Sequence, residues 1–497
     1  NDPKKLKSSG GPITQDNTGV EYYCTIFAAN ESPLQEGLMW VGSDDGLIHL
    51  TRDGGKNWTN ITPKNMPEWM MINSVDPSPF DPTTCYVAGT RYKSGDFRPY
   101  LYKTTDYGQT WQQITTGISE EHFTRVVRAD PNRKGLLYAG TETGMYISFD
   151  DGQSWKPFQK NLPIVPITDL TIKDNSLIVA TQGRSLWMID DLTVLHQLSA
   201  TDSNQKMKLF TPKPSYRINA GGGQDSLTEG TNLPGGVTLH YYLENYDSDK
   251  DSLTIEIATA DGTPIQTFSN HDKKNKLKAQ AKGNTFRWNL RYEGAERLDG
   301  MILWGASLAG ARAVPGTYQA SLILNDQRAT TTFEVLPDPR AEVTVAQMLE
   351  QFDFVNGINA TIDRAHKAIK NIRKVNKKLD EFVQNNNEKD VAKELVNQAK
   401  TLRKALSEIE KALYQTQNRS NQDPLNFPIR LTNKLGHVNN LVMMSDFPPT
   451  DQDRKVSEEL SALIHAQLEK YDALMDKEVK AFNTAFAALE LDYLSTP

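Results

Sequence analysis

Apolar and polar residues alternate in short runs over roughly the first two hundred residues. Three runs end in glycine, MWVG at 39–42, YVAG at 86–89 and LYAG at 137–140. Each is followed by a second alternating run: LIHL, YLYK and MYIS respectively. Alternation with a period of two predicts half-buried β-strands. The pattern therefore predicts a repeated unit of strand, loop, strand, tight turn and strand.

One eight-residue motif, Thr/Ser-x-Asp-x-Gly-x-x-Trp, closes each of the three units at 51–58, 104–111 and 148–155. We expect the Asp to cap a hairpin turn, the glycine to supply a positive φ, and the tryptophan to pack between adjacent sheets. Repetition at this spacing indicates β-propeller blades. The structural residues predicted from the motif are Asp53, Trp58, Asp106, Trp111, Asp150 and Trp155.

A first strand beginning at residue 22 and a degenerate stretch at 167–198 bring the expected count to about four blades. A closed propeller needs about four blades at least and usually more, and an open ring exposes its sheet edges. We therefore expect missing blades from an N-terminal fragment of the same gene product, packed against residues 20–200. Residues 1–20 are interpreted as a lead-in, without an initiator methionine or signal sequence, and 21–200 as a partial propeller.

The three motifs resemble those of the Asp-box or BNR-repeat propellers, which include sialidases, xyloglucanases and the sortilin luminal domain. The segments at 42–58 and 177–192 are similar to large secreted bacterial proteins with sortilin-type repeats, which are loosely named glycosyl hydrolases. The resemblance implies that the chain is the C-terminal part of such a protein. It also implies an exported protein, located in the periplasm or at the cell surface of a bacterium.

The pattern changes twice after the blades. Residues 201–236, rich in Pro, Gly and Ser, are interpreted as a linker with a returning strand. Alternating strands over 237–337 predict a small immunoglobulin-like or fibronectin-like β-sandwich, in which core packing of Trp288 is favoured over a row of exposed aromatics. A helical period over 341–495 then predicts an α-helical bundle, self-contained in the favoured interpretation and a docking surface in the alternative.

Composition excludes several functions. A formal net charge of -7 without a basic face disfavours nucleic acid as a partner. No apolar run approaches the roughly 20 residues that span a bilayer. The two cysteines, Cys24 and Cys85, lie in no CxxC or His/Cys cluster, so we expect no metal site and no cofactor. A disulfide between them is the alternative to simple burial.

Propeller ligands generally contact the loops between the second and third strands and the links between blades. In these segments we predict seven binding residues: Trp69, Arg91, Tyr92, Asp96, Arg98, Tyr100 and Arg184. A glycosidase needs two carboxylates about 5 to 10 Å apart, one of them with a raised pKa. Asp44, Asp45 and Glu142 are weak candidates for that role, because aspartate also caps turns, and no catalytic residue is assigned.

Two hypotheses follow. The favoured one is a non-catalytic extracytoplasmic binding or scaffold protein, whose propeller face binds a protein, a peptide or a glycan. Its C-terminal domains would then dock partners such as outer-membrane or cell-surface proteins. The alternative is a glycoside hydrolase that acts on extracellular polysaccharide. The lack of a recognisable catalytic constellation favours the first.

Overall fold

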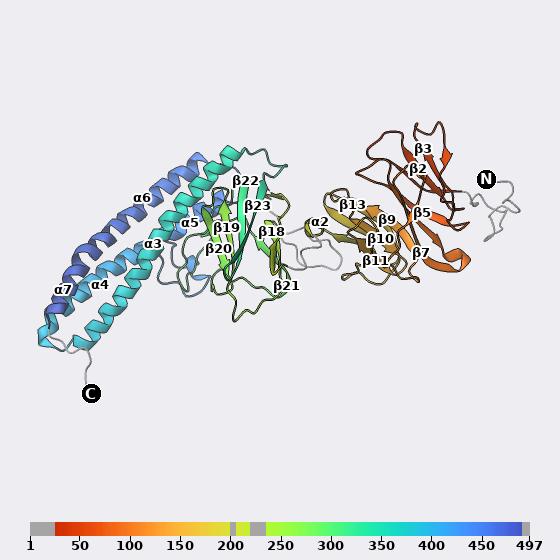
Figure 1. Cartoon of the computed structure of the whole chain (residues 1–497). Helices are drawn as coiled ribbons and strands as arrows, with labels where there is room; N and C mark the ends of the chain where they lie inside the picture. Colours follow the sequence, from red (N-terminus) through yellow and green to blue (C-terminus); the bar gives the residue numbers. More distant parts are fainter. Residues whose placement is uncertain (1–24, 199–204, 219–234, 490–497) are drawn as a thin grey trace. The chain divides into compact units, whose positions relative to one another are not determined.

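The computed structural model describes residues 25–198, 205–218 and 235–489 (Figure 1). The chain divides into two compact units, residues 1–200 and 201–497. Four small β-sheets make up the first unit, and two sheets and the C-terminal helices make up the second. The predicted lead-in, the Cys24 half of the possible disulfide and parts of the predicted linker lie outside the described residues. The Cys85 thiol is free and buried.

Each sheet of unit 1 is an antiparallel blade whose strands follow one another in sequence order. Three blades have four strands, the last of only two residues, and the fourth blade has three strands followed by the short helix α2 (Thr193–Gln197). The predicted all-β propeller segment is therefore confirmed. The strands are β1 (Ile26–Glu31), β2 (Met39–Ser43), β3 (Ile48–Thr51), β4 (Thr59–Asn60), β5 (Met71–Pro77), β6 (Cys85–Arg91), β7 (Asp96–Thr104), β8 (Gln112–Gln113), β9 (Thr124–Ala129), β10 (Leu137–Thr141), β11 (Gly144–Ser148), β12 (Lys156–Pro157), β13 (Ile167–Lys173), β14 (Ser176–Thr181) and β15 (Leu186–Ile189).

The three motifs form the same turn between the third and fourth strands of their blades. In the first, the Asp53 carboxylate accepts bonds from the Thr51 hydroxyl (2.8 Å) and from the Asn57 amide (2.9 Å). The bond from the Asn57 backbone is the main reason why the pKa of Asp53 is lowered to about 2. In the other two motifs the carboxylates of Asp106 and Asp150 accept the same two kinds of hydrogen bond. The glycine at the fifth position of each motif has a φ between +81° and +89°. These aspartates thus order the turns.

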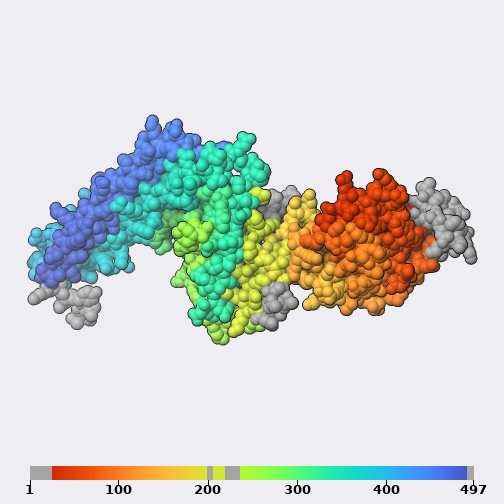
Figure 2. All heavy atoms as spheres, turned by 45° about the horizontal axis from the view of Figure 1, so that its top comes forward, coloured from red at the N-terminus to blue at the C-terminus, as the bar shows by residue number. Residues whose placement is uncertain are grey.

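Tryptophans of the motif join neighbouring blades in two of the three cases. The Trp111 indole donates to the Ile61 carbonyl (2.8 Å), and the Trp155 indole donates to the Ile114 carbonyl (2.7 Å). In each pair the acceptor belongs to the preceding blade, and Figure 2 shows the space-filled blades as one continuous body from red to orange. Trp58, the tryptophan of the first motif, has 44% of its surface exposed, and no preceding blade lies among the described residues.

Unit 2 begins with two sheets that enclose one apolar core. Trp288 is fully buried in it and packs against the rings of Tyr318 (5.6 Å) and Phe333 (6.1 Å). Two short strands, β16 and β17, lie within the predicted linker and pair with these sheets, so that segment belongs partly to the sandwich. The sheets are β16 (Met207–Leu209), β18 (Val237–Leu243) and β21 (Lys282–Trp288), and β17 (Ser215–Tyr216), β23 (Gln327–Leu336), β22 (Gly316–Leu324), β19 (Leu253–Thr259) and β20 (Pro264–Ser269).

The C-terminal helical region is confirmed. Its long first helix begins at a capping box in which Thr344 and Gln347 bond to each other's backbone amides. Helices α3, α4 and α6 run side by side, and the shorter α5 packs on α3 (Figure 1). A π-helical stretch at residues 474–479 joins the last two helices. The helices are α3 (Val345–Asn386), α4 (Lys393–Leu413), α5 (Leu431–Val442), α6 (Asp451–Ala473) and α7 (Lys480–Ala488).

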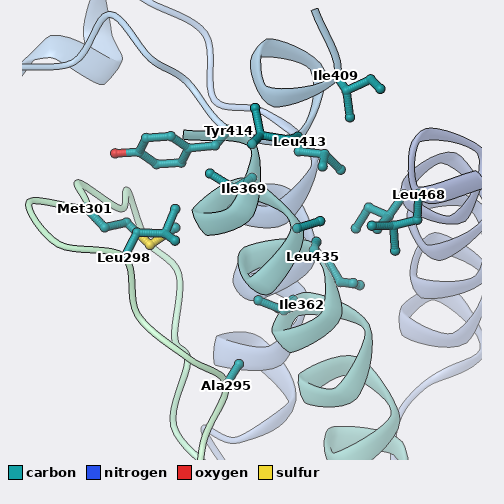
Figure 3. Packing of buried hydrophobic residues seen from close by; sticks show 14 of the residues in the cluster. Ala295, Leu298, Met301, Ile362, Ile369, Ile409, Leu413, Tyr414, Leu435 and Leu468 are labelled. Carbon is teal, nitrogen blue, oxygen red and sulfur yellow. The ribbon is translucent and has the colours of Figure 1, made fainter. Parts of the chain in front are cut away.

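A long loop of the sandwich, residues 289–313, is packed into the core of the helices. Ala295, Leu298 and Met301 lie against α3 and α5 near Ile362, Ile369 and Leu435 (Figure 3). The loop backbone is also bonded to the helices, since the Asn439 side-chain amide donates to the Ser307 carbonyl at 3.1 Å. The helical region therefore does not bury its apolar stripe alone, as the sequence suggested, but shares its core with the sandwich.

Loss of an inter-blade indole bond should destabilise unit 1. Replacing Trp155 by Phe leaves the buried Ile114 carbonyl without its donor, which costs about 1–3 kcal/mol. Trp58→Phe is the matched control, because its indole is half exposed and has no bond among the described residues. Urea unfolding followed by circular dichroism should show a lower midpoint for Trp155→Phe and an unchanged one for Trp58→Phe. Equal midpoints would contradict the assigned role.

Protonation of His366 should destabilise unit 2. Its imidazole is fully buried, and Nδ1 donates to the Glu296 carbonyl at 2.5 Å. Burial lowers the pKa of His366 below its ordinary 6.5, although Asp363 and Glu296 oppose the shift. Because the unfolded chain then binds the proton more readily, the free energy of unfolding should fall as the pH drops below 6.5.

The slope is at most about 1.4 kcal/mol per pH unit for one proton. Urea unfolding between about pH 7.5 and about pH 5.5, followed by the helical circular dichroism signal, measures this slope. His366→Gln should flatten it, whereas His465→Gln, at an exposed position on α6, should leave it unchanged. A slope that survives His366→Gln would show that another group is responsible.

Candidate ligand-binding face of the blades

Antiparallel order places the loops between second and third strands at one end of every blade, and the Asp-box turns at the other. The inner strands β1, β5, β9 and β13 pack side by side, so the four loops and the links between blades share one face. We call it the loop face. It carries all of the predicted binding residues and all three weak catalytic candidates, whereas the Asp boxes lie at the opposite end.

Asp96 is the centre of a bonded cluster in the loop between β6 and β7. Its carboxylate accepts from Arg98 Nε (3.0 Å) and Nη2 (2.9 Å), from Arg91 Nη1 (3.1 Å) and from the Tyr100 hydroxyl (2.7 Å). The bonds from Arg98 hold the pKa of Asp96 far below its usual range, although burial opposes them. A general acid must carry a proton at working pH, so Asp96 orders this loop and cannot serve in that role.

An aromatic stack lies beside this cluster. The Tyr92 and Phe123 rings are stacked at 5.1 Å, and the Phe97 ring packs on Phe123 at 6.0 Å. The Arg125 guanidinium lies over Phe123 at 5.3 Å and pairs with Glu142 at 2.6 Å. Phe97, near the start of β7, is 52% exposed, whereas Phe123 is buried. The stack therefore presents one exposed ring on a rigid base, and we call it the Phe97 platform.

The three catalytic candidates lie in two different blades. Asp44 accepts from the Thr25 amide (2.9 Å) and Asp45 from the Ser43 hydroxyl (2.5 Å), both in blade 1. Glu142 belongs to blade 3, with blade 2 between them, and is bonded to Arg125. Each carboxylate thus already accepts a bond from a neighbouring group.

The other predicted binding residues are dispersed over the loop face. Trp69, with a φ of 58°, lies in the link between blades 1 and 2. Arg184 is exposed in the blade 4 loop, where Nη1 donates to the Gly183 carbonyl at 3.0 Å. The sequence prediction omitted Phe97, Phe123 and Arg125. An aromatic residue between charged residues at a loop tip, as in GDFR at 95–98, was the signal that could have found Phe97.

No group of three metal-ligating side chains occurs among the described residues. No described helix is both long enough and apolar enough to cross a membrane.

A family model matches the blades. Residues 46–211 match the model described as "Sortilin, neurotensin receptor 3", named Sortilin-Vps10. This segment is therefore similar to a sortilin-type propeller. The match begins within the loop between β2 and β3, includes all three Asp boxes and extends through blade 4. The sortilin-type motif thus coincides with the part of the chain in which the loop face is formed.

Curated relatives and solved structures are also similar to parts of the chain. An oligoxyloglucan reducing end-specific xyloglucanase of Emericella nidulans is 26% identical over 106 residues, which are 21% of this chain and 13% of that enzyme. YCF48 bound to D1 peptide is 23% identical, with a TM-score of 0.27 over 33% of this chain and 52% of its own. The GH74 xyloglucanase of Xanthomonas campestris is 12% identical, with a TM-score of 0.28 over 60% and 54%.

Each match covers less than two thirds of the relative's own length, and the curated xyloglucanase is covered only to about an eighth. Both TM-scores lie well below 0.5, so no conclusion about this chain rests on the two solved structures.

Loss of the Asp96 carboxylate charge should loosen the loop of the Phe97 platform. Asp96→Asn removes the charge that the two arginines share, so the amides of residues 92–98 should exchange faster with solvent. We expect about a tenfold change, equivalent to about 1.4 kcal/mol. Hydrogen exchange followed by mass spectrometry measures it, with Asp45→Asn in blade 1 as the control. Unchanged exchange at 92–98 would show that Asp96 does not order the loop.

Proposed function

We propose that this chain is a non-catalytic extracytoplasmic binding or scaffold protein, and that its loop face binds a glycan or a peptide through the Phe97 platform. The observation that carries the proposal is the exposed Phe97 ring, held by Phe123 and Tyr92 beside the Arg98–Asp96 ion pair. An exposed aromatic ring with guanidinium and carboxylate groups beside it is suited to sugar rings and to apolar peptide side chains.

The state of the carboxylates supports binding over hydrolysis. Asp96 is fully engaged by cations, and Glu142 is paired with Arg125. A retaining or inverting glycosidase needs one carboxyl group that carries a proton and a second across the sugar site. The glycoside hydrolase alternative rests on the 26% identity with the xyloglucanase over 106 residues, and on carboxylates that further blades would have to supply.

Unit 2 is proposed to position the loop face and to dock a partner. Its sandwich, which we expect to have an immunoglobulin-like or fibronectin-like topology, places loop 289–313 in the core of the helices, so the two parts pack as one body. Outer-membrane or cell-surface proteins are the proposed partners. Export to the periplasm or cell surface is part of the same proposal, which follows from the resemblance to secreted propellers.

Binding should depend on the exposed ring. The purified chain is immobilised and tested against xyloglucan oligosaccharides, other extracellular glycans and a library of extended peptides. Phe97→Ala should weaken binding of any ligand found by about tenfold, the effect of losing an aromatic anchor. Phe80→Ala is the matched control, since Phe80 is 39% exposed in the loop between β5 and β6, at the opposite end of the same blade.

Measurement of reducing sugar distinguishes the two functions. The binding proposal predicts that incubation with the bound glycan releases none, in the wild type and in Glu142→Gln alike. Release by the wild type that is lost in Asp44→Asn, Asp45→Asn or Glu142→Gln would favour the hydrolase. Equal affinities of the wild type and Phe97→Ala would show that the ligand binds elsewhere.

A further inference from the structure

Blade 1 has an apolar face that no described blade covers. Its inner strand β1 is exposed almost throughout, with Ile26 65% and Phe27 55% exposed, and Trp58 is 44% exposed at the outer end of the blade. The equivalent inner strand of blade 2, β5, is largely buried. Two contacts recur between neighbouring blades, the first at the junctions of blades 1 and 2 and of blades 3 and 4, and the second at those of blades 1 and 2 and of blades 2 and 3. They indicate what such a face receives.

The first repeated contact is an isoleucine of an inner strand against a glycine of the preceding blade. Ile72 on β5 is fully buried, and a Cβ atom placed on Gly42 of blade 1 would lie 2.2 Å from its Cγ2. Ile167 on β13 and Gly140 of blade 3 repeat this relation at 2.6 Å. Only glycine leaves room for the branched side chain at these positions.

Ile26 occupies the position of Ile72 in blade 1. The turns after the two inner strands are equivalent, because the Ser32 amide donates to the Leu38 carbonyl as the Ser78 amide does to the Thr84 carbonyl. Each isoleucine lies at the same spacing before its serine. Ile26 is therefore the side chain that would enter the glycine position of a preceding blade.

The second repeated contact is made at the Asp box. Ile61 and Ile114 directly follow the short fourth strands β4 and β8, and their carbonyls accept the Trp111 and Trp155 indoles. Their side chains also fill the space at Gly108 and Gly152 of the next Asp box, where an added Cβ would lie 2.6 Å from the isoleucine Cδ1 in both cases.

At the Asp box of blade 1 this contact has no counterpart in the part of the chain that the structure describes. An added Cβ on Gly55 would meet only the ring of Trp58, at 3.8 Å, and the Trp58 indole makes no bond among the described residues. Ile26, Gly55 and Trp58 are thus one half of the same junction that joins the other blades.

We propose that this face of blade 1 binds a further Asp-box blade of the same gene product. The blade presents a glycine at the end of its second strand to Ile26, and a β-branched residue directly after its fourth strand to Gly55. The backbone carbonyl of that β-branched residue accepts the Trp58 indole. The occupant is therefore specified by residue type at two positions and by one hydrogen bond.

A second copy of this chain does not fit the requirement. Its last described blade has no fourth strand, and Ala180 stands at the glycine position of its second strand. In its other blades the glycines Gly42 and Gly140 are already filled by Ile72 and Ile167. Binding of a second copy of the chain to this face of blade 1 would therefore overturn the proposal.

Photo-cross-linking in the intact native protein tests the occupant. Benzoylphenylalanine replaces Ile26 in the tagged full protein in its own host, and cross-linked peptides are identified by mass spectrometry after irradiation. We expect a peptide that carries an Asp-box motif absent from this sequence, with a glycine or a β-branched residue at the predicted position. The control places the same probe at Leu463, which is 54% exposed on α6.

Three results would overturn the proposal: cross-links to peptides of a second copy, cross-links to a protein without Asp boxes, or a yield no higher than at Leu463. A second variant tests the register of the junction. When the probe replaces Ile26, the additional substitution Trp58→Phe keeps an aromatic side chain but removes the indole N–H donor. It should lower the cross-link yield about three- to tenfold. An unchanged yield would contradict the assigned hydrogen bond.

Discussion

The junction between neighbouring blades is the contact on which unit 1 depends. Each blade is a sheet of three or four short strands, and so small a sheet is not stable unless one face is covered. Between blades 1 and 2 the junction places Ile72 against Gly42, and the Trp111 indole donates to the Ile61 carbonyl. Each of the other two junctions has one of these two contacts. Stability then accumulates from neighbour to neighbour, as in other repeat architectures.

The same junction orients the loops. Because every blade meets its neighbour in one register, the loops between second and third strands come to one face and the Asp boxes to the other. Thr124 illustrates the connection, since its hydroxyl accepts from the Tyr100 amide of the preceding blade at 3.0 Å. The Phe97 platform is therefore assembled from blades 2 and 3 and exists only when those blades are joined.

Unit 2 is organised by a different constraint, the need to bury a long loop of the sandwich. Residues 289–313 have little regular structure, so their backbone polar groups need partners wherever they are buried. The Asn359 and Asn439 side chains supply them by donating to the Ala309 and Ser307 carbonyls. Between the sandwich and the helices, Arg217 is buried beside Asp446, and burial lowers the pKa of Arg217 to about 10. The sandwich and the helices are consequently one folded body.

Local regularities in the sequence determined much of this protein. The period of two, the Asp boxes and the later helical period place the blades, the strands of the sandwich and the helices, because each depends only on residues close in the chain. The family resemblance followed from the same motifs. The loop segment that contains Asp96 and Arg98 was also identified in this way, although not what those residues do there.

Only the tertiary structure decided which of these residues are available. Trp58, Trp111 and Trp155 stand in the same motif, yet their exposure differs because it depends on whether a preceding blade is present. Asp96, which was predicted as a binding residue, orders its loop, since folding brings three donor side chains to one carboxylate. Phe97 became a platform because Phe123, distant in sequence, lies beneath it. Burial and pairing arise from contacts between distant segments, and no local pattern encodes them.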